Sequence, residues 1–204
     1  RHHGLSFMFV PLDAEGVTVR PIEQLDGLPG FAEIFFDDVR VPSFNRLGGE
    51  GEGWSIAMST AGFERGLMLR SPARFQQTAK KLVALYRECV DDIIDLSIED
   101  AVVKSYMDAE AYALNTYMTA SRLIKGGKIG AEASLNKIFW SELDLSMQET
   151  AMSLLGAKSE LLGAEGAGEW LDTFMFAQSG PIYAGTNEIQ RNIIAERLLG
   201  MPRK

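Results

Sequence analysis

Short apolar runs separated by turn residues occupy the first part of the chain. Runs at 5–10, 17–21 and 31–36 are bounded by glycine, proline or aspartate, a pattern that predicts three β-strands. Three strands make too small a sheet to be stable alone. We therefore expect residues 5–42 to belong to a larger β structure whose N-terminal portion precedes this sequence.

After the strands the apolar pattern changes to the period of a helix. Three seams follow in which apolar residues recur every three or four positions, as in helices that face a bundle core. The second and third helices are expected to end at Gly126-Gly127 and Gly156, and shorter helices are expected at 166–178 and 187–199. The seams consist of Phe75, Ala79, Leu82, Tyr86, Cys89 and Ile93, of Val103, Met107, Leu114, Tyr117 and Ile124, and of Leu135, Ile138, Leu145, Met152 and Leu155.

Strands followed by long helices predict a mostly α fold, and the family resemblance described below implies a C-terminal four-helix bundle preceded by a fragment of an antiparallel β-domain. That resemblance assigns residues 1–50 to the C-terminal part of the β-domain and residues 51–204 to the helical bundle domain. Linkers of a few residues between the long helices favour antiparallel neighbours. Pro72 has no backbone N–H to donate, so we expect it to start a helix or to kink one.

The segment Gly48-Gly49-Glu50-Gly51-Glu52-Gly53 joins the two parts and superficially resembles a phosphate-binding loop. Two carboxylates inside it would repel phosphate, and no Lys-Ser or Lys-Thr pair follows it. We interpret it as a joint in which glycine permits the tight turns.

Charge and composition narrow the class of protein. The net charge of −8 argues against nucleic acid as a partner, because no stripe of Lys and Arg could follow a phosphate backbone. No apolar run is long enough to span a bilayer. Cys89 is the single cysteine, which fits a reducing compartment, and we expect no signal peptide. We expect a cytoplasmic protein, or a mitochondrial matrix protein if the source is eukaryotic.

Histidine chemistry is not expected. His2 and His3 are the two histidines of the chain, they are adjacent, and no partner stands at ligand spacing, so no metal site is predicted. No Ser-His-Asp or Cys-His set can be assembled for the same reason.

The segment 181–192 is the most informative for chemistry. Gly185 permits a sharp bend, and Thr186 or Asn187 can cap the helix that follows; Asn187 and Gln190 have the spacing of a capping box. Free backbone N–H groups beside the bend would suit an anionic or electron-rich group. Taken alone, the pattern is also that of an ordinary capped helix.

Three collinear segments resemble the acyl-CoA dehydrogenase family. Residues 182–200, Ile-Tyr-Ala-Gly-Thr-Asn-Glu-Ile-Gln-Arg-Asn-Ile-Ile-Ala-Glu-Arg-Leu-Leu-Gly, closely resemble its C-terminal signature. Residues 32–42 are similar to its final β-domain strand and continue through 47–54 to Phe63-Glu64-Arg65-Gly66, and residues 1–6 are similar to a strand in the middle of that domain. The resemblance covers the whole chain in the order of the family.

The resemblance implies an N-terminal helical domain, a central β-domain and a C-terminal four-helix bundle, of which this chain supplies the last part. It implies FAD as the cofactor, an acyl-CoA thioester as the substrate and an electron-transfer flavoprotein as the electron acceptor. It also implies a dimer or tetramer, built from one kind of subunit or from two. In the family reaction a carboxylate takes the α-proton while the β-hydrogen leaves as hydride to FAD.

The resemblance assigns two catalytic roles. In many members the base is a Glu between the Tyr and the Gly of the signature, where this chain has Ala184, which cannot take a proton. Other members carry the base in a Glu-Arg pair of the first bundle helices, which corresponds here to Glu64-Arg65. Glu64 is therefore the expected base, against the alternative of a solvated helix carboxylate. The backbone N–H of Ala184 is expected to donate to the thioester oxygen.

The resemblance also points to cofactor contacts. Thr186, Asn187 and Glu188 match positions that contact FAD in the family. Residues 153–157, with Leu155 and Gly156 at their centre, resemble the stretch that approaches the adenosine end of FAD across a subunit contact. The family's Arg-x-x-Phe-Gly flavin contact has no clear counterpart, and Arg74 is its weak candidate.

Two alternatives to an active dehydrogenase stay open. Ala184 and the weak arginine match would also suit a catalytically silent subunit that supports an active homologue in a mixed assembly. An acyl-CoA oxidase on the same fold would differ in letting oxygen reoxidise the flavin. The acyl group is not readable from the sequence, although a base on a helix favours a long or branched one.

Overall fold

The computed structural model describes residues 2–67, 70–89, 95–161 and 167–203, and of residues 61–67 the backbone alone. The chain divides into two compact units, Arg1–Arg65 and Gly66–Lys204. The boundary between the units falls inside a helix, and the domain boundary at 50/51 stays a prediction.

The first unit contains two antiparallel strand pairs. Its elements are β1 (Phe7–Met8), β2 (Val17–Glu23), β3 (Pro29–Phe36), the 3-10 turn η1 (Ser43–Asn45), β4 (Arg46–Leu47) and helix α1 (Gly53–Leu67). β1 pairs with β4, and β2 pairs with β3 with Val19 opposite Ile34 and a register shift between Ile22 and Glu23. The expected antiparallel strands are confirmed, although the first is shorter than its apolar run.

The glycine-rich segment forms the turn between β4 and α1. Gly48 and Gly51 have positive φ angles of 72° and 82°, which favour glycine. Gly53 begins α1, its N–H donates to the carbonyl of Leu5 at 2.7 Å, and a Cβ there would lie 2.6 Å from the carbonyl carbon of Ser6. The prediction of a joint built on tight turns is therefore confirmed.

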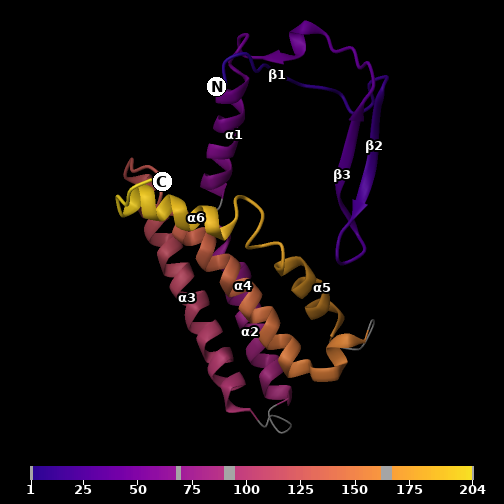
Figure 1. The fold of residues 1–204 in the computed structure, drawn as a ribbon. Coiled ribbons are helices and arrows are strands. Elements are labelled where there is room, and N and C mark those ends of the chain that lie inside the picture. Colours follow the sequence, from indigo (N-terminus) through magenta and orange to yellow (C-terminus); the bar gives the residue numbers. More distant parts are fainter. Residues whose placement is uncertain (1, 68–69, 90–94, 162–166, 204) are drawn as a thin grey trace. The chain divides into compact units, whose positions relative to one another are not determined.

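The second unit is helical (Figure 1). Three long helices, α2 (Pro72–Cys89), α3 (Leu96–Ile124) and α4 (Ala133–Leu155), pack against one another, and α5 (Gly168–Ala177) and α6 (Asn187–Ile193) pack on α4. The 3-10 helix η3 (Gly156–Glu160) follows α4, and the π-helix η4 (Ile194–Leu198) follows α6. The mostly helical fold class is confirmed.

Several predicted helix boundaries are confirmed by the residues that set them. Pro72 is the first residue of α2, where its missing N–H costs no helical hydrogen bond. α3 ends at Ile124 just before Gly126, whose φ is 83°, and α4 ends at Leu155 before Gly156, whose φ is 53°. Glycine leaves the helical conformation at both positions.

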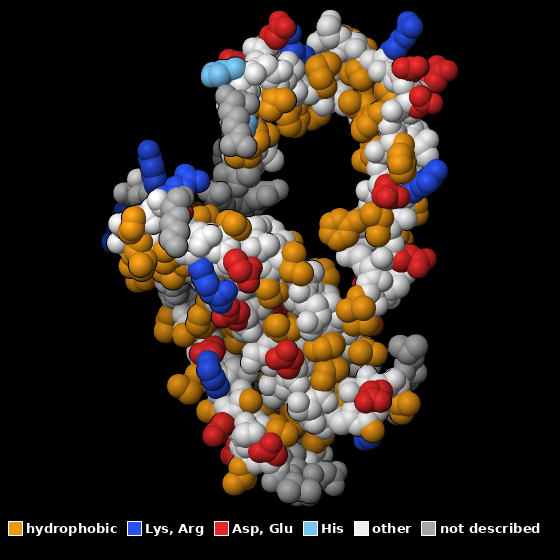
Figure 2. Space-filling model, in the orientation of Figure 1, with side chains coloured by type: hydrophobic (Ala, Val, Ile, Leu, Met, Phe, Trp, Pro, Cys, Tyr) orange, Lys and Arg blue, Asp and Glu red, His pale blue; other side chains and the backbone are white. Residues whose placement is uncertain are grey.

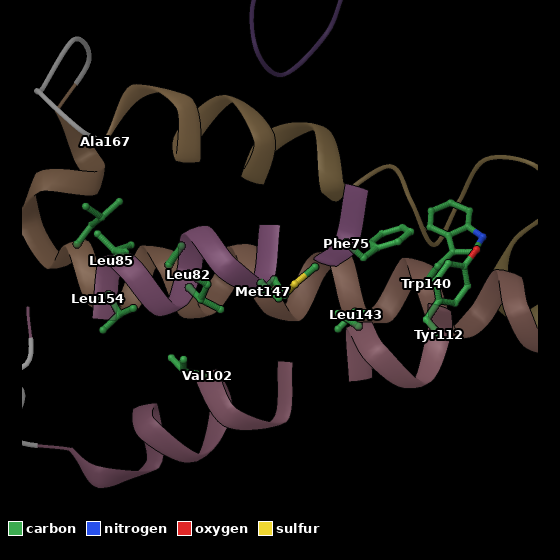
Figure 3. Close-up of a cluster of buried hydrophobic side chains, with 14 residues drawn as sticks. Phe75, Leu82, Leu85, Val102, Tyr112, Trp140, Leu143, Met147, Leu154 and Ala167 are labelled. Atoms are coloured by element: carbon green, nitrogen blue, oxygen red, sulfur yellow. The ribbon is translucent and has the colours of Figure 1, made fainter. Parts of the chain in front are cut away.

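The core of the second unit lies between α2, α3 and α4 (Figure 3). Phe75 and Leu82 of α2 are 0% exposed, and Tyr86 and Cys89 pack at the edge of the same cluster. The predicted seam of α2 is therefore confirmed in the described residues; its last member, Ile93, lies outside them. The cluster consists of Phe75, Ala79, Leu82, Leu85, Val102, Ala109, Tyr112, Trp140, Leu143, Met147, Ala151, Leu154, Leu155 and Ala167.

The predicted seam of α3 is wrong. Its five members are exposed: Val103 by 52%, Met107 by 64%, Leu114 by 69%, Tyr117 by 57% and Ile124 by 87%, and Figure 2 shows hydrophobic side chains at the surface along α3. The buried face carries small and hydroxyl-bearing residues instead, namely Ser105, Ala109, Ala113, Thr116 and Thr119, together with Val102 and Tyr112.

Hydrogen bonding within α3 explains why its polar face can be buried. The hydroxyls of Ser105, Thr116 and Thr119 donate to the carbonyls four residues earlier, at 2.8 to 2.9 Å. A buried hydroxyl that finds a partner in its own helix costs little, and the small side chains allow close packing. The apolar period of α3 therefore marks a face directed away from the core of this chain.

The predicted seam of α4 is largely wrong as well. Leu135 is 47% exposed, Ile138, Leu145 and Met152 are half-buried, and Leu155, at 9% exposure, is the one buried member of the five. The core side of α4 carries Trp140, Leu143, Met147, Ala151 and Leu154 together with buried polar residues. Those polar residues broke the apolar period that the prediction followed, and they form part of the site described next.

Candidate functional site

A left-handed turn precedes α6. Ala184 and Gly185 have φ angles of 55° and 88°, a conformation that costs a non-glycine residue about 1 kcal/mol. A Cβ at Gly185 would lie 2.6 Å from Nε2 of Gln190. The sequence prediction of a sharp bend at Gly185 is confirmed, and the bend begins one residue earlier, at Ala184.

The side chain of Gln190 holds the two turn residues. Its Nε2 donates to the carbonyls of Ala184 at 3.2 Å and Gly185 at 3.3 Å. Thr186 is the N-cap of α6 and accepts from the N–H of Ile189 at 3.4 Å. The predicted Thr186 cap is confirmed, and the predicted capping box of Asn187 with Gln190 is wrong because Gln190 turns to the carbonyls before the helix.

The backbone N–H of Ala184 is a candidate hydrogen-bond donor. Ala184 and Gly185 are exposed residues, and within the described part of the chain no acceptor receives a hydrogen bond from the Ala184 N–H. An unpaired N–H at an exposed residue of a restrained turn can donate to an incoming oxygen atom.

A buried polar network fixes the start of α6 to α4. Lys137 is 0% exposed, and its Nζ donates to Oδ1 of Asn187 at 2.7 Å. Ser141 donates to the same oxygen at 3.2 Å, and Nδ2 of Asn187 donates to Glu142 at 3.3 Å. Arg191 pairs with Glu142. Both polar atoms of the Asn187 side chain thus have partners inside the protein, and Asn187 itself is 3% exposed.

The charges of this network perturb each other. Burial lowers the pKa of Lys137 because the ammonium loses water, and the carboxylates of Glu188 and Glu142 oppose that shift. The pKa of Glu188 is lowered, first by a hydrogen bond from its own backbone N–H and then by the Thr186 side chain. Glu188 is therefore a stable carboxylate on the exposed side of α6, with the buried ammonium behind it.

A second cluster lies next to the turn. Arg70 donates to the hydroxyl of Tyr183, and its guanidinium carbon lies 4.9 Å from the ring centroid of Trp140 and 5.3 Å from that of Tyr183. The Trp140 and Tyr183 rings are 5.8 Å apart. Burial raises the pKa of the Tyr183 hydroxyl, and the charge of Arg70 opposes that shift. Tyr183 therefore stays neutral and acts as an acceptor for Arg70.

Arg74 pairs with a buried carboxylate of α4. Its Nη2 donates to Oδ2 of Asp144 at 2.7 Å, and Asp144 is 4% exposed. Burial raises the pKa of Asp144, and Arg74 opposes the shift. The second oxygen, Oδ1, has no partner within the described part of the chain. A contact between Arg74 and a flavin stays a prediction.

The structure brings some of the predicted site residues together and separates others. Ala184, Thr186, Asn187 and Glu188 are consecutive around the turn. Leu155 and Gly156 lie at the far end of α4 from the Ser141 contact, about 21 Å along the helix axis. Such a distance fits the expectation that they serve a site on another subunit, which stays a prediction.

The backbone of Glu64 lies in α1, and its side chain falls outside the side chains that the structure describes. Its role as base therefore stays a prediction.

Sequence reasoning missed Lys137, Arg70, Trp140 and Asp144. The signal for Lys137 and Asp144 was available in principle: single charges on the inner face of an otherwise packed helix need partners. Arg70 and Trp140 gave no sequence pattern, because their contacts join segments far apart in the sequence.

In the part of the chain that the structure describes, no helix is long and apolar enough to cross a membrane, and no three His, Cys, Asp or Glu side chains are grouped as metal ligands.

The strained turn leads to a test of local stability. We expect Gly185→Ala to destabilise the second unit by about 1 to 2 kcal/mol, because the new Cβ collides with Gln190 in a left-handed backbone. Ala184→Gly is expected to be neutral or stabilising, since it relieves the φ of 55°. Thermal unfolding, monitored by circular dichroism, measures the transition temperatures of the two variants. Equal transition temperatures for both variants would contradict the turn geometry.

Comparison with known proteins gives a consistent result. The family model described as "Acyl-CoA dehydrogenase, C-terminal domain" matches residues 51–199. The chain is 37% identical over 207 residues to acyl-CoA dehydrogenase IpdE1 of Mycolicibacterium smegmatis, covering 100% of this chain and 51% of that protein. It is 31% identical to an acyl-CoA dehydrogenase of Bacillus subtilis, covering 97% and 53%. The chain thus spans about half the length of the curated relatives it matches.

Solved structures show the same fold. A structure described as "Tcur3481-Tcur3483 steroid ACAD" is similar with a TM-score of 0.87 and 26% identity, covering 100% of this chain and 53% of that one. The ChsE4-ChsE5 complex from Mycobacterium tuberculosis contains a chain with a TM-score of 0.80 and 28% identity, covering 100% and 55%.

Proposed function

The chain belongs to the acyl-CoA dehydrogenase family, and from that premise we propose that it is the C-terminal part of an FAD-dependent enzyme that desaturates an acyl-CoA thioester between its α and β carbons. FAD, when bound, supplies the acceptor for the β-hydride, and an electron-transfer flavoprotein is the proposed acceptor of its electrons. The contribution of this chain is to hold the thioester and to take the α-proton.

The observation that carries the proposal is the Ala184 N–H. Loss of the α-proton gives the thioester oxygen enolate character, so a donor aimed at that oxygen lowers the barrier. Ala184 is an exposed residue, its N–H is unpaired within the described residues, and its carbonyl is held by Gln190. A restrained donor is more effective than water because it needs no reorganisation during the reaction.

Glu64 is the proposed base. Ala184 occupies the position that carries a carboxylate in many members, and an alanine side chain cannot accept a proton. A carboxylate from α1 would replace it if it lies desolvated beside the α-carbon, where its proton affinity rises.

The described residues fit part of a flavin site. Ala184, Gly185 and Glu188 are exposed and Thr186 is half-buried, so the backbone of the turn is accessible to a cofactor. Asn187 fits less well through its side chain, which is fully engaged with Lys137, Ser141 and Glu142. We infer that Asn187 serves the cofactor site by fixing the backbone at the start of α6.

A second candidate function is a silent subunit in a mixed assembly. The absence of a carboxylate at Ala184 favours it, and so does the likeness to chains of the Tcur3481-Tcur3483 and ChsE4-ChsE5 assemblies. Such a subunit would retain the fold and the turn while the partner subunit performs the chemistry.

One experiment separates the two candidates. The full-length protein is purified alone, its flavin is quantified from the yellow absorbance, and a panel of linear, branched and polycyclic acyl-CoAs is added without oxygen. We expect bound FAD that is bleached by at least one acyl-CoA. Bound FAD that no acyl-CoA bleaches would support the silent subunit, and protein without flavin under all conditions would contradict a dehydrogenase formed by this protein alone.

The exposed apolar face of α3 supports the proposed oligomer. Val103, Met107, Ala111, Leu114 and Met118 follow one another at steps of four, four, three and four along its outer side. Leu135 and Phe139 of α4 border it, around a groove of about 440 Å³. An apolar stripe with this spacing is typical of a helix that packs against another helical subunit.

The assembly can be tested on this face. Met107→Glu with Leu114→Glu places two charges on it, and we expect the full-length protein to lose its dimer or tetramer, because burying an unpaired carboxylate in an apolar interface is costly. Light scattering coupled to gel filtration measures the mass. Ser97→Glu, which adds a charge to the exposed first turn of the same helix, is the control and should leave the mass unchanged. An unchanged mass in the double variant would place the interface elsewhere.

A further inference from the structure

Arg70 connects the start of the bundle to the turn before α6. It precedes α2, it is half-buried, and its guanidinium donates to the hydroxyl of Tyr183, 113 residues later in the chain. The same guanidinium lies over the faces of the Trp140 and Tyr183 rings, with its carbon 4.9 and 5.3 Å from their centroids. A cation over two aromatic faces gains from both, and more when it is partly desolvated.

Arg70 is itself held by the core. Its backbone carbonyl accepts from the hydroxyl of Tyr112 at 3.1 Å. Tyr112 and Trp140 are each 1% exposed, and they lie together at one end of the core cluster (Figure 3). Both the backbone and the side chain of Arg70 are therefore fixed against side chains that cannot move without disturbing the core.

The hydrogen bond of the neighbouring arginine goes elsewhere. Arg74 donates to the buried carboxylate of Asp144, whereas within the described part of the chain the side-chain hydrogen bond of Arg70 goes to Tyr183. The charges of both arginines act on Asp144 and on Tyr183, but the hydrogen bond to the segment before α6 comes from Arg70.

We propose that Arg70 is a positioning residue, which holds Tyr183 against Trp140 and thereby fixes the direction in which the Ala184 N–H points. The inference rests on the proposed function, since it assigns Arg70 to the thioester site. Tyr183 immediately precedes Ala184, whose φ of 55° belongs to a sparsely populated region. Gln190 holds the carbonyls of Ala184 and Gly185, and Arg70 holds the side chain of the residue before them, Tyr183. A residue in such a conformation keeps it only where its surroundings determine it.

The arrangement has a specific consequence for the reaction. A donor that stabilises developing charge must be aimed within a narrow range, and its support comes from residues that do not touch the substrate. Loss of Arg70 should therefore slow the α-proton step at saturating acyl-CoA more than it weakens acyl-CoA binding. If Arg70 only packed over Trp140, its loss would not lower the rate of the α-proton step more than the affinity for acyl-CoA.

The first arm of the test needs no activity. Hydrogen exchange of the full-length holoprotein is followed in the peptide 179–190, where the amides of Tyr183 and Asn187 donate to the carbonyls of Ser179 and Pro181. We expect Arg70→Met and Tyr183→Phe to accelerate exchange there about tenfold, because each removes one charge-assisted hydrogen bond. The double variant should be no faster than either single one, since both remove the same contact. A peptide from the middle of α4 is the internal control.

The second arm measures the rate of flavin bleaching as a function of acyl-CoA concentration. Arg70→Met is expected to lower the saturating rate about tenfold with less than a twofold change in the concentration for half-maximal rate. Arg70→Lys should recover part of the rate, because lysine can still donate to Tyr183 whereas the similarly sized methionine cannot. Tyr183→Phe, which removes a single oxygen atom, keeps the test valid if Arg70→Met does not fold.

The outcomes distinguish the inference from the function on which it rests. Unchanged exchange in 179–190 for Tyr183→Phe, or equal rates for Arg70→Lys and Arg70→Met, would overturn the positioning role. If the wild-type protein binds FAD and no acyl-CoA bleaches it, the proposed dehydrogenase falls, and the exchange experiment still decides whether Arg70 fixes the turn.

Discussion

Glu64→Gln in the full-length protein is expected to reduce flavin bleaching by acyl-CoA by a factor of about 10² to 10⁴, the usual contribution of a positioned base. Glutamine keeps the size of the side chain and one hydrogen bond, but it lacks the carboxylate that accepts the α-proton. The loss should therefore lie in the rate at saturating acyl-CoA, with FAD content and acyl-CoA affinity retained. Anaerobic stopped-flow absorbance measures the rate, and equilibrium dialysis measures the affinity.

Two further variants sharpen this test. Glu52→Gln removes a carboxylate just before the start of α1 and should leave bleaching unchanged. Ala184→Glu in the Glu64→Gln background is expected to restore part of the rate, because it returns a carboxylate to the position used by many members of the family. In the wild-type background Ala184→Glu should be neutral or harmful, since two close carboxylates raise each other's pKa. Undiminished bleaching in Glu64→Gln would remove Glu64 as the base.

Phe75→Ala is expected to have the largest effect on stability. Phe75 is 0% exposed, and its ring lies 5.1 Å from that of Tyr112 and 6.4 Å from that of Trp140. Truncating such a residue leaves a cavity and lowers the free energy of unfolding by about 3 to 5 kcal/mol. The melting temperature of the bundle should then be roughly 10 °C lower, as measured by differential scanning calorimetry of the full-length protein.

Phe75→Leu is the matched control for the cavity. It keeps most of the apolar volume, so the loss should be about 1 to 2 kcal/mol. A graded shift, small for leucine and large for alanine, is the expected result. A shift below about 2 °C for Phe75→Ala would show that the packing between α2, α3 and α4 is not the main source of stability.

The sequence predicted those parts of the fold in which local preference and tertiary packing agree. The seam through Phe75 and Leu82, the helix start at Pro72 and the helix end at Gly156 follow from apolar period, a missing N–H and a permissive backbone. Each of these signals lies within one element, and nothing elsewhere in the chain opposes it.

The prediction failed where contacts between segments distant in the sequence determine which helix face is buried or which partner a side chain binds. The polar inner face of α3 depends on hydroxyls that bond within the helix, so its apolar period pointed to the wrong side. Asn187 has the sequence signature of a capping-box residue, but Lys137 from α4 takes its side chain. Gly185 predicted the bend and the resemblance drew attention to the Ala184 N–H, whereas the contacts that restrain the turn, through Arg70 and Trp140, required the three-dimensional structure.

The exposed stripe of α3 also has a consequence for how this protein is handled. If the stripe is covered in the assembly, part of the free energy that keeps α3 folded comes from subunit association rather than from the chain itself. By mass action the melting temperature then rises with protein concentration. Dilution would then favour a folded monomer with an exposed apolar surface that aggregates readily, so recovery of the protein should improve with its concentration.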